Sequence, residues 1–225
     1  MHLLLDDHDL DGVAGVDEAG RGPWAGPVMA AAAILTPRSA EALRAAGVDD
    51  SKALTRKARE RCFEVIRAQQ AAGHLWLAIE PAEVCEIDEL NILHATMAAM
   101  SRAVTALAVP VRRALIDGNR VPALDCPGEA IIGGDAKVLS IATASIAAKV
   151  SRDRLMTELA ETHPGYGWER NAGYGTAQHR AGLARLGPCV HHRRSFAPIR
   201  ALLSARSAGR RPALRVMPSR LVRRH

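Results

Sequence analysis

The chain has 225 residues, of which 48% are hydrophobic and 24% charged, a composition typical of one domain with a full core. No uninterrupted apolar run reaches the roughly 18 residues of a transmembrane helix, so that class of protein is excluded. The N-terminal stretch lacks the basic start and the long apolar core of a secretory signal, and we expect a cytoplasmic protein. The cysteines are scattered without a C-x-x-C pair, which favours free thiols in a reducing compartment: Cys62, Cys85, Cys126 and Cys189.

The net charge of +6 is concentrated near the C-terminal end. Residues 200–225 hold eight arginines and no acid, and removing those eight from the 30 basic residues leaves 22 against 24 acids. Such a segment is typical either of attraction to polyanions such as nucleic acid or of a solvated, disordered extension. We therefore divide the chain into a flexible acidic N-terminus over 1–11, a folded domain over 12–199 and a basic tail over 200–225 that is predicted to be disordered.

Hydrophobic patterns and turn residues predict strands interspersed with helices. The predicted strands are 12–16, 27–35, 74–80, 113–116 and 130–132, and the first two are expected to form a hairpin. The predicted helices are 55–71 with Thr55 as N-cap, a short helix from Pro81 to before Asn91, 91–107, 139–161 and 176–186. Small residues crowd the first half of 139–161, so this helix is expected to approach its neighbour closely. This mixture of elements indicates an α/β domain.

Acidic residues recur at the expected ends of three short apolar strands: Asp17 with Glu18, Asp117, and Asp135. In α/β proteins, ligands bind outside the strand ends, where such side chains project. Clustered carboxylates raise one another's pKa unless a cation compensates their charge, and oxygen ligands favour Mg²⁺ or Mn²⁺. Two such ions about 3.5–4 Å apart can support phosphodiester cleavage. Acids at turns are also common in proteins without any metal site, so spacing alone leaves both readings open.

Three other features suggest contacts with a ligand. Residues 20–25 match the dinucleotide pattern G-x-G-x-x-G/A, but Pro23 and Pro27 would break the helix that this pattern needs, and an apolar run follows. We therefore interpret these residues as a bare turn that a sugar or phosphate can approach. Tyr166, Trp168 and Tyr174 share one glycine-rich loop and could either stack on a base or sugar or form a small core. The basic group 191–194 is interpreted as phosphate contacts or as surface.

Seven segments resemble, in order and spacing, the type 2 ribonucleases H and specifically bacterial ribonuclease HII. They are GVDEAGRGPWAGPV, DSKALTRKARE, NILHATMAAM, IDGN, GGDAKVLSIATASIAAKVSRDRLM, HPGYGWERNAGYGT and HRRSFAP, and they cover roughly residues 12 to 199. The resemblance implies a ribonuclease H-like mixed sheet flanked by helices, with a helical C-terminal extension. It implies hydrolysis of RNA paired with DNA, and cleavage at single ribonucleotides in duplex DNA, by water that divalent metal activates. The products would carry 5′-phosphate and 3′-hydroxyl ends.

The resemblance also implies roles for individual residues. The family's catalytic, metal-binding acids correspond to Asp17, Glu18, Asp117 and Asp135, with Mg²⁺ or Mn²⁺ as cofactor. The family's glycine-arginine-glycine turn corresponds to Gly20, Arg21 and Gly22, whose backbone would read the ribose 2′-hydroxyl. Tyr174 would pack against the sugar at an RNA–DNA junction, and Lys52, Ser145 and Lys149 are candidate phosphate ligands. Asp153 is predicted to form an ion pair with Lys149, four residues away on the same helix.

The sequence departs from the family at Asn171 and Ala172, where members often carry His-Lys before the GYGT string. Rival interpretations are ribonuclease HIII, another ribonuclease H-like nuclease such as a resolvase or transposase, and a non-catalytic binder that uses the basic tail. An intact set of acids disfavours the binder, because negative charge facing phosphates would weaken binding. The expected partners are RNA–DNA hybrid and ribonucleotide-containing DNA, with no membrane, and the expected state is a monomer.

Overall fold

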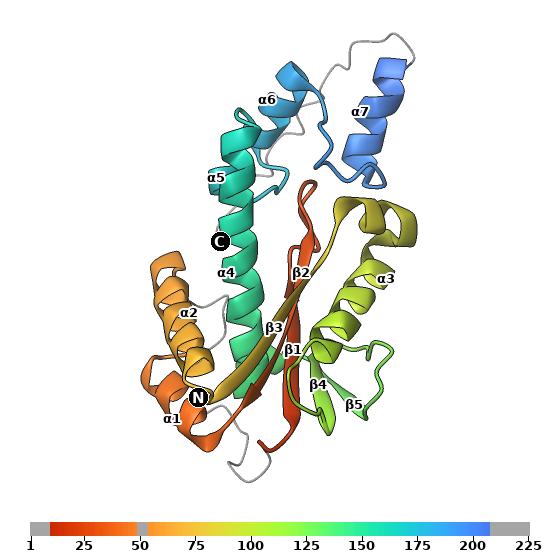
Figure 1. The fold of residues 1–225 in the computed structure, drawn as a ribbon. Helices are drawn as coiled ribbons and strands as arrows, with labels where there is room; N and C mark the ends of the chain where they lie inside the picture. The colour runs from red at the N-terminus through yellow and green to blue at the C-terminus, as the bar shows by residue number, and fades with distance from the viewer. Residues whose placement is uncertain (1–9, 49–53, 208–225) are drawn as a thin grey trace, which may run out of the picture.

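The computed structural model describes residues 10–48 and 54–207. Within them, a mixed sheet of five strands forms the centre of the molecule (Figure 1). The strand order is β3-β2-β1-β4-β5; β1 pairs antiparallel with β2 and parallel with β4. The strands are β1 Val13–Ala19, β2 Val28–Leu35, β3 Leu75–Ala82, β4 Arg113–Asp117 and β5 Gly128–Ile131. The mixed sheet and the β1–β2 hairpin confirm the predicted fold class.

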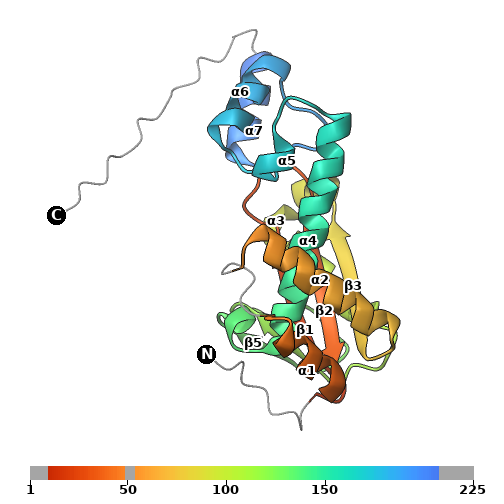
Figure 2. The ribbon, with the colours of Figure 1, turned by 90° about the vertical axis from the view of Figure 1, so that its left-hand side faces the viewer.

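Helices cover both faces of this sheet. Helix α3, Val84–Thr105, packs on one face, and α4, Leu139–Thr162, covers the other together with α1, Pro37–Ala45, and α2, Arg56–Ala71. Figure 2 shows three short helices gathered beyond one end of the sheet: α5 Trp168–Asn171, α6 Ala177–Leu186 and α7 Ala197–Ser207. None of the helices in the described part of the chain combines the length and hydrophobicity that a bilayer crossing needs.

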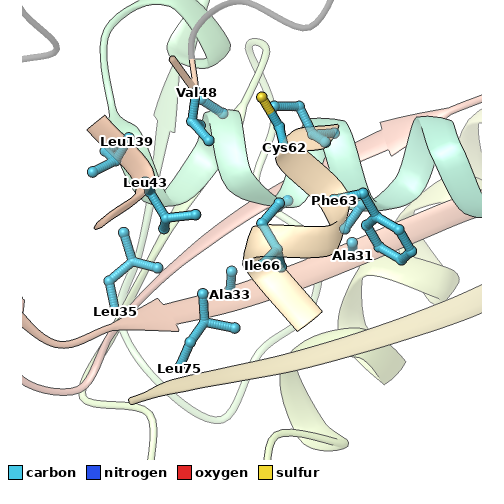
Figure 3. Packing of buried hydrophobic residues seen from close by; sticks show 14 of the residues in the cluster. Ala31, Ala33, Leu35, Leu43, Val48, Cys62, Phe63, Ile66, Leu75 and Leu139 are labelled. Carbon is cyan, nitrogen blue, oxygen red and sulfur yellow. The ribbon is translucent and has the colours of Figure 1, made fainter. Parts of the chain in front are cut away.

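Strand β2 is buried on both of its faces. Ala31, Ala33 and Leu35 belong to the cluster that contains residues of α1 and α2, which Figure 3 shows around Phe63 and Ile66. Residues 30, 32 and 34 belong to the other cluster, beneath α3. Burial on both faces explains why the sequence of this strand is a continuous apolar run and not an alternating pattern.

Helix α4 lies close to β1, as its small residues predict. Ala144, Ala147 and Ala148 are fully buried. On the facing strand, a Cβ atom added to Gly15 would overlap the backbone of Ser140. A glycine is therefore required where α4 crosses β1, and this approach brings the buried Ser145 to the position of Asp17.

Of two predictions for the region around Asn91, one needs correction and one is confirmed. Pro81 does not begin a helix but lies in β3, which is an edge strand, where a missing backbone N–H costs little. The predicted break between two helices at Asn91 is confirmed, because α3 consists of two helices separated at this residue, whose backbone is non-helical with a φ of 70° and a ψ of 165°. The Asn91 side chain accepts hydrogen bonds from the N–H groups of Leu93 and His94, so it caps the second half of α3.

The C-terminal end is helical further than predicted. Helix α7 continues to Ser207, so the prediction of disorder is wrong for residues 200–207. Ile199 of this helix is fully buried in the cluster formed with α4, α5 and α6. This packing, which composition alone does not reveal, is the physical reason for the difference. Residues 208–225, with the remaining arginines of the predicted tail, lie outside the described residues, as do 1–9.

Candidate active site

Three acidic residues meet where β1 and β4 run side by side. Val16 pairs with Ile116 in the parallel register, so the next residues on the two strands, Asp17 and Asp117, are neighbours. Glu18 follows Asp17 directly, and its backbone N–H donates to Asp17 Oδ1 over 2.7 Å. The pairing of two strands that are far apart in the sequence thus brings three carboxylates to one end of the sheet.

The fourth predicted acid, Asp135, lies beside this group. It belongs to a short 3₁₀ helix, η2 Gly134–Ala136, and is 3% exposed. The backbone N–H of Gly134 donates to Asp117 Oδ1 over 2.7 Å, which ties the segment carrying Asp135 to the end of β4. An added Cβ at Gly134 would lie 2.6 Å from Ile141 Cδ1, so glycine permits this close fit.

The positions of the acids relative to the strands differ from the prediction. Asp17 and Glu18 lie inside β1 and not after it, because β1 remains paired with β2 as far as Ala19. Asp117 is the last residue of β4, and Asp135 is separated from β5 by a turn. The acids therefore rest on paired strands and a short helix, which hold their backbones more firmly than open turns would.

Burial and mutual repulsion act on this cluster. The pKa of Asp17 is raised well above its ordinary value by burial and then by the charges of Glu18 and Asp117, while a hydrogen bond from Ser145 acts in the opposite direction. Burial also raises the pKa of Glu18, against the lowering effect of Arg21. Arg21 Nη1 donates to Glu18 Oε1 over 3.2 Å. The cluster is thus a largely buried group of carboxylates, and Arg21 is the cationic side chain that pairs with one of them, Glu18.

The donor set has the chemistry of a site for a hard divalent cation, because every candidate ligand is a carboxylate oxygen. The side chains do not yet converge as ligands: no three His, Cys, Asp or Glu groups in residues 10–48 and 54–207 form a ready metal site. Two of the acids are engaged elsewhere, Glu18 with Arg21 and Asp117 with the N–H of Gly134.

The glycine-arginine-glycine turn follows β1 without a break. Gly20 has a φ of +99°, a backbone conformation that side chains rarely adopt. No helix follows this turn; the chain continues into β2, which rules out the dinucleotide-binding geometry. Arg21 and Gly22 are exposed, so the turn presents its backbone at the surface beside the acids.

Two buried arginines bind the backbone of this turn and of the residues that follow it. Arg152 of α4 is 1% exposed, and Arg193 is fully buried. Arg193 donates to the carbonyl oxygens of residues 20, 21 and 26 over 2.6, 2.9 and 2.9 Å. Arg152 donates to those of residues 25, 27 and 172 over 3.0, 2.9 and 2.9 Å. The interpretation of 191–194 as phosphate contacts or surface is therefore wrong for His192 and Arg193, because both are buried.

The aromatic loop divides into a core and an exposed ring. Tyr166 and Trp168 are buried and stack with their ring centroids 4.9 Å apart. Tyr174 is instead 47% exposed, and an added Cβ at Gly22 would lie 3.4 Å from its Cε1. The small core is thus confirmed for Tyr166 and Trp168, whereas Tyr174 is exposed beside the glycine-arginine-glycine turn and its stacking on a sugar stays a prediction.

A buried histidine pair, which sequence reasoning missed, fixes the backbone of Tyr174. His179 Nδ1 lies 3.0 Å from the carbonyl oxygen of Tyr174; since a carbonyl only accepts, Nδ1 carries the proton. His192 Nδ1 accepts from the N–H of Cys189, so His192 Nε2–H donates to His179 Nε2 over 3.0 Å. Burial lowers the pKa of both histidines, that of His192 to about 3. No spacing in the sequence indicates this pairing.

The remaining candidate ligands have different outcomes. Lys149 Nζ and Asp153 Oδ1 are 2.6 Å apart, which confirms the predicted ion pair. Lys52 lies outside the described residues. At the family departure, Asn171 Oδ1 accepts from the N–H of Gly173, and Ala172 adopts a left-handed φ of 46°. The tyrosine loop therefore keeps a defined backbone without the usual His-Lys pair.

A family model described as Ribonuclease HII matches residues 14–199. The chain belongs to the ribonuclease HII family. Relatives named Ribonuclease HII include one from Rhodospirillum rubrum, 55% identical over 196 residues, 87% of this chain and 88% of that protein. Another, from Burkholderia thailandensis, is 57% identical over 196 residues, 86% of this chain and 88% of that protein. The ribonuclease HII family comprises endoribonucleases that cut the RNA strand of RNA–DNA hybrids, and this is the activity of the chain.

Solved structures agree on the fold. The ribonuclease H2 of Pyrococcus horikoshii is 27% identical, with a TM-score of 0.69, over 85% of this chain and 97% of that one. A structure titled Bst-RNase HIII in complex with Mn²⁺ has a TM-score of 0.69 at 19% identity and covers 88% of this chain but 71% of that one. At such identity the second match supports the fold alone.

We predict that Asp17→Asn raises the free energy of unfolding near pH 7.5 in metal-free buffer, because the variant buries no charge there. The pKa of Asp17 is higher in the folded chain than its ordinary value of 3.8. Between these two values the folded chain binds more protons than the unfolded one, so the stability of the wild type falls as pH rises. Each unit of pKa difference corresponds to about 1.4 kcal/mol.

Urea unfolding near pH 7.5 and again near pH 4.5 measures this effect. The gain should be larger at the higher pH and shrink toward the unfolded pKa. Glu64→Gln, which removes an exposed carboxylate of α2 paired with Arg154, provides the control. A variant of Asp17 that is less stable than the wild type near pH 7.5 would contradict the assignment of burial as the dominant effect.

Proposed function

We propose that this ribonuclease H also cleaves at single ribonucleotides embedded in duplex DNA and leaves 5′-phosphate and 3′-hydroxyl ends. The observation that carries the proposal is the adjacency of three elements: the carboxylates of β1 and β4, the glycine-arginine-glycine turn and the exposed ring of Tyr174. A ribonucleotide differs from a deoxyribonucleotide by its 2′-hydroxyl, so an enzyme that selects one must contact that group. The turn and the ring lie next to the acids, where a cleaved linkage would have to lie.

The catalytic residues in this proposal are Asp17, Glu18, Asp117 and Asp135, which would hold Mg²⁺ or Mn²⁺. Asp17 would be the central ligand of this set, since both Glu18 and Asp117 lie close enough to raise its pKa. When bound, the ions supply charge neutralisation and lower the pKa of water for attack on phosphorus. Charge compensation also removes the repulsion that raises the pKa of the acids in the free protein.

The protein groups around the acids orient them before any ion binds. Ser145 hydrogen-bonds to Asp17, and the N–H of Gly134 holds Asp117 Oδ1. Arg21 neutralises part of the charge of Glu18 in the free protein. If Glu18 were to bind a cation, the guanidinium of Arg21 would be available to a phosphate of the substrate.

In this proposal, the glycine-arginine-glycine turn and the Tyr174 ring recognise the ribose. The backbone of Gly20, Arg21 and Gly22 would contact the 2′-hydroxyl, because a bare backbone can come closer to a sugar than a side chain can. Tyr174 would pack against the sugar at the RNA–DNA junction. Ser145 and Lys149 are weaker candidates for phosphate contacts, since each already has a partner in Asp17 or Asp153. Lys52 remains a sequence-based candidate.

A cleavage assay on three duplexes tests the proposed function. The substrates are an RNA–DNA hybrid, DNA with one ribonucleotide and DNA alone, each with Mg²⁺ and then with Mn²⁺. We expect cleavage of the first two and none of the third. Cleavage of the hybrid alone would favour the substrate preference of a different ribonuclease H type, and cleavage of DNA would favour a resolvase or transposase.

We predict that Asp17→Asn lowers cleavage of the hybrid by about a hundredfold or more, since loss of a ligand removes several kcal/mol of charge stabilisation. Hybrid binding should remain, because the turn and the ring are untouched. Glu64→Gln is the matched control. Magnesium-dependent cleavage by the Asp17 variant at the wild-type rate would refute the metal assignment.

We predict that Tyr174→Ala lowers cleavage at a single ribonucleotide more than cleavage of a long hybrid. Loss of an aromatic contact with a nucleotide costs about 1–3 kcal/mol, and a long hybrid offers many alternative sites. The control is Tyr174→Phe, which keeps the ring and should keep most of the activity. Equal losses on both substrates would count against a junction role for this ring.

A further inference from the structure

Arg193 stands out because it is a fully buried cation whose guanidinium donates hydrogen bonds to three backbone carbonyls. It is 0% exposed, and its Nη2 and Nη1 donate to the oxygens of Gly20 and Arg21 over 2.6 and 2.9 Å. Its Nε donates to Gly26 O over 2.9 Å. Among the residues described, Arg193 forms no salt bridge with a carboxylate. Burying a charge costs free energy unless the charged group is hydrogen-bonded. The guanidinium therefore favours a turn conformation in which these carbonyl oxygens face it.

The carbonyl groups that Arg193 binds determine the direction of two backbone N–H groups. The oxygen of Gly20 shares its peptide plane with the N–H of Arg21, and the oxygen of Arg21 shares its plane with the N–H of Gly22. In a trans peptide, oxygen and hydrogen point in opposite directions, and the described part of the chain has no cis peptide. Because both oxygens face the buried guanidinium, both N–H groups face away from it, on the side where Arg21 and Gly22 are exposed.

These two amides are therefore available to a ligand. Within the described ranges, neither has a hydrogen-bond acceptor in the protein, although the neighbouring N–H of Trp24 bonds to Gly173 O over 2.8 Å. Tyr174 borders the same spot, 3.4 Å from a Cβ placed on Gly22. Two adjacent, outward N–H donors beside an exposed ring form a surface suited to an oxygen-bearing ligand.

We infer that Arg193 is a positioning residue for ribose selection: by binding the carbonyls of Gly20 and Arg21, it aims the following amides at the 2′-oxygen of the substrate. This inference rests on the proposed function, in which the turn reads the ribose. It assigns Arg193 no contact with substrate. Its effect passes through the peptide planes of the turn, and it acts on discrimination between RNA and DNA more than on stability alone.

Arg193 is itself held in place by further contacts. Its N–H donates to Trp24 O over 2.9 Å, and its guanidinium lies 5.1 Å from the ring centroid of Phe196. Asp88 of α3 accepts from the N–H of Arg194 and from both the N–H and the hydroxyl of Ser195. Asp88 thus fixes the segment that carries Arg193, without being part of the turn.

The test is the ratio of two dissociation constants, measured without divalent metal so that no cleavage occurs. One is for all-DNA duplex and the other for the same duplex with one ribonucleotide, and their ratio is the preference for the 2′-hydroxyl. Arg193→Lys keeps the charge but loses the fork that reaches two oxygens at once. We expect the preference to fall about fivefold or more, the equivalent of one lost hydrogen bond.

Ile66→Ala is the comparison for general destabilisation, because Ile66 of α2 is fully buried in a cluster that includes no residue of 20–22 or of the Tyr174 loop. We expect it to lower the melting temperature as Arg193→Lys does and to retain the preference. In addition, the Gly22 amide signal in a ¹H–¹⁵N spectrum should move in the Arg193 variant and stay in place in the Ile66 variant. Equal losses of preference in both variants would overturn the inference, since they would reflect general destabilisation.

If Arg193→Lys does not fold, Asp88→Asn carries the test. This variant loosens the segment behind Arg193, and the preference should fall in the same direction by a smaller factor; an unchanged preference would overturn the inference. The wild type serves to separate this inference from the proposed function. A wild type without any preference for the ribonucleotide would contradict ribose reading by the turn itself, whichever variant is used.

Discussion

The structure depends on the parallel pairing of β1 with β4, which places Asp17 beside Asp117 against their mutual repulsion. The pairing is supported by the buried apolar residues that precede the acids on both strands and by α4, which crosses β1 at Gly15. Burial of apolar surface, and not attraction between the acids, holds the carboxylates together. The raised pKa of Asp17 is the visible consequence, because the fold forces a partly dry carboxylate to share its surroundings with other acids.

A second framework is attached to the first through the turn after β1. Arg193 binds carbonyls of this turn, and Arg152 binds those of Ala25 and Pro27 just after it and that of Ala172 in the loop that carries Tyr174. The sheet positions the acids, whereas the buried arginines and the histidine pair position the turn and the ring. Helix α4 links the two frameworks, because it contributes both Ser145 and Arg152. It therefore fixes the position of the acids relative to the residues proposed to recognise the ribose.

The sequence predicts those parts of the site that depend on local pattern. Apolar runs and turn residues indicate the hairpin and β4, small residues indicate the close approach of α4, and the family resemblance assigns roles to the acids. It could not predict the role of Arg193, whose partner Gly20 lies 173 positions away. In a chain rich in arginine, a buried arginine has no pattern that separates it from a surface one. The sequence also predicts a helix at Pro81 wrongly, because only the sheet order shows that β3 is an edge strand, where proline is tolerated.

The most direct test of the account is Mn²⁺ binding measured by electron paramagnetic resonance on the wild type and on Asp17→Asn, Asp117→Asn and Glu64→Gln. If carboxylates of β1 and β4 share a cation, the first two variants should bind Mn²⁺ about tenfold or more weakly, since even indirect changes at metal sites cost this much. The Glu64 variant should bind like the wild type. Wild-type affinity in both the Asp17 and Asp117 variants would contradict a metal site at this end of the sheet.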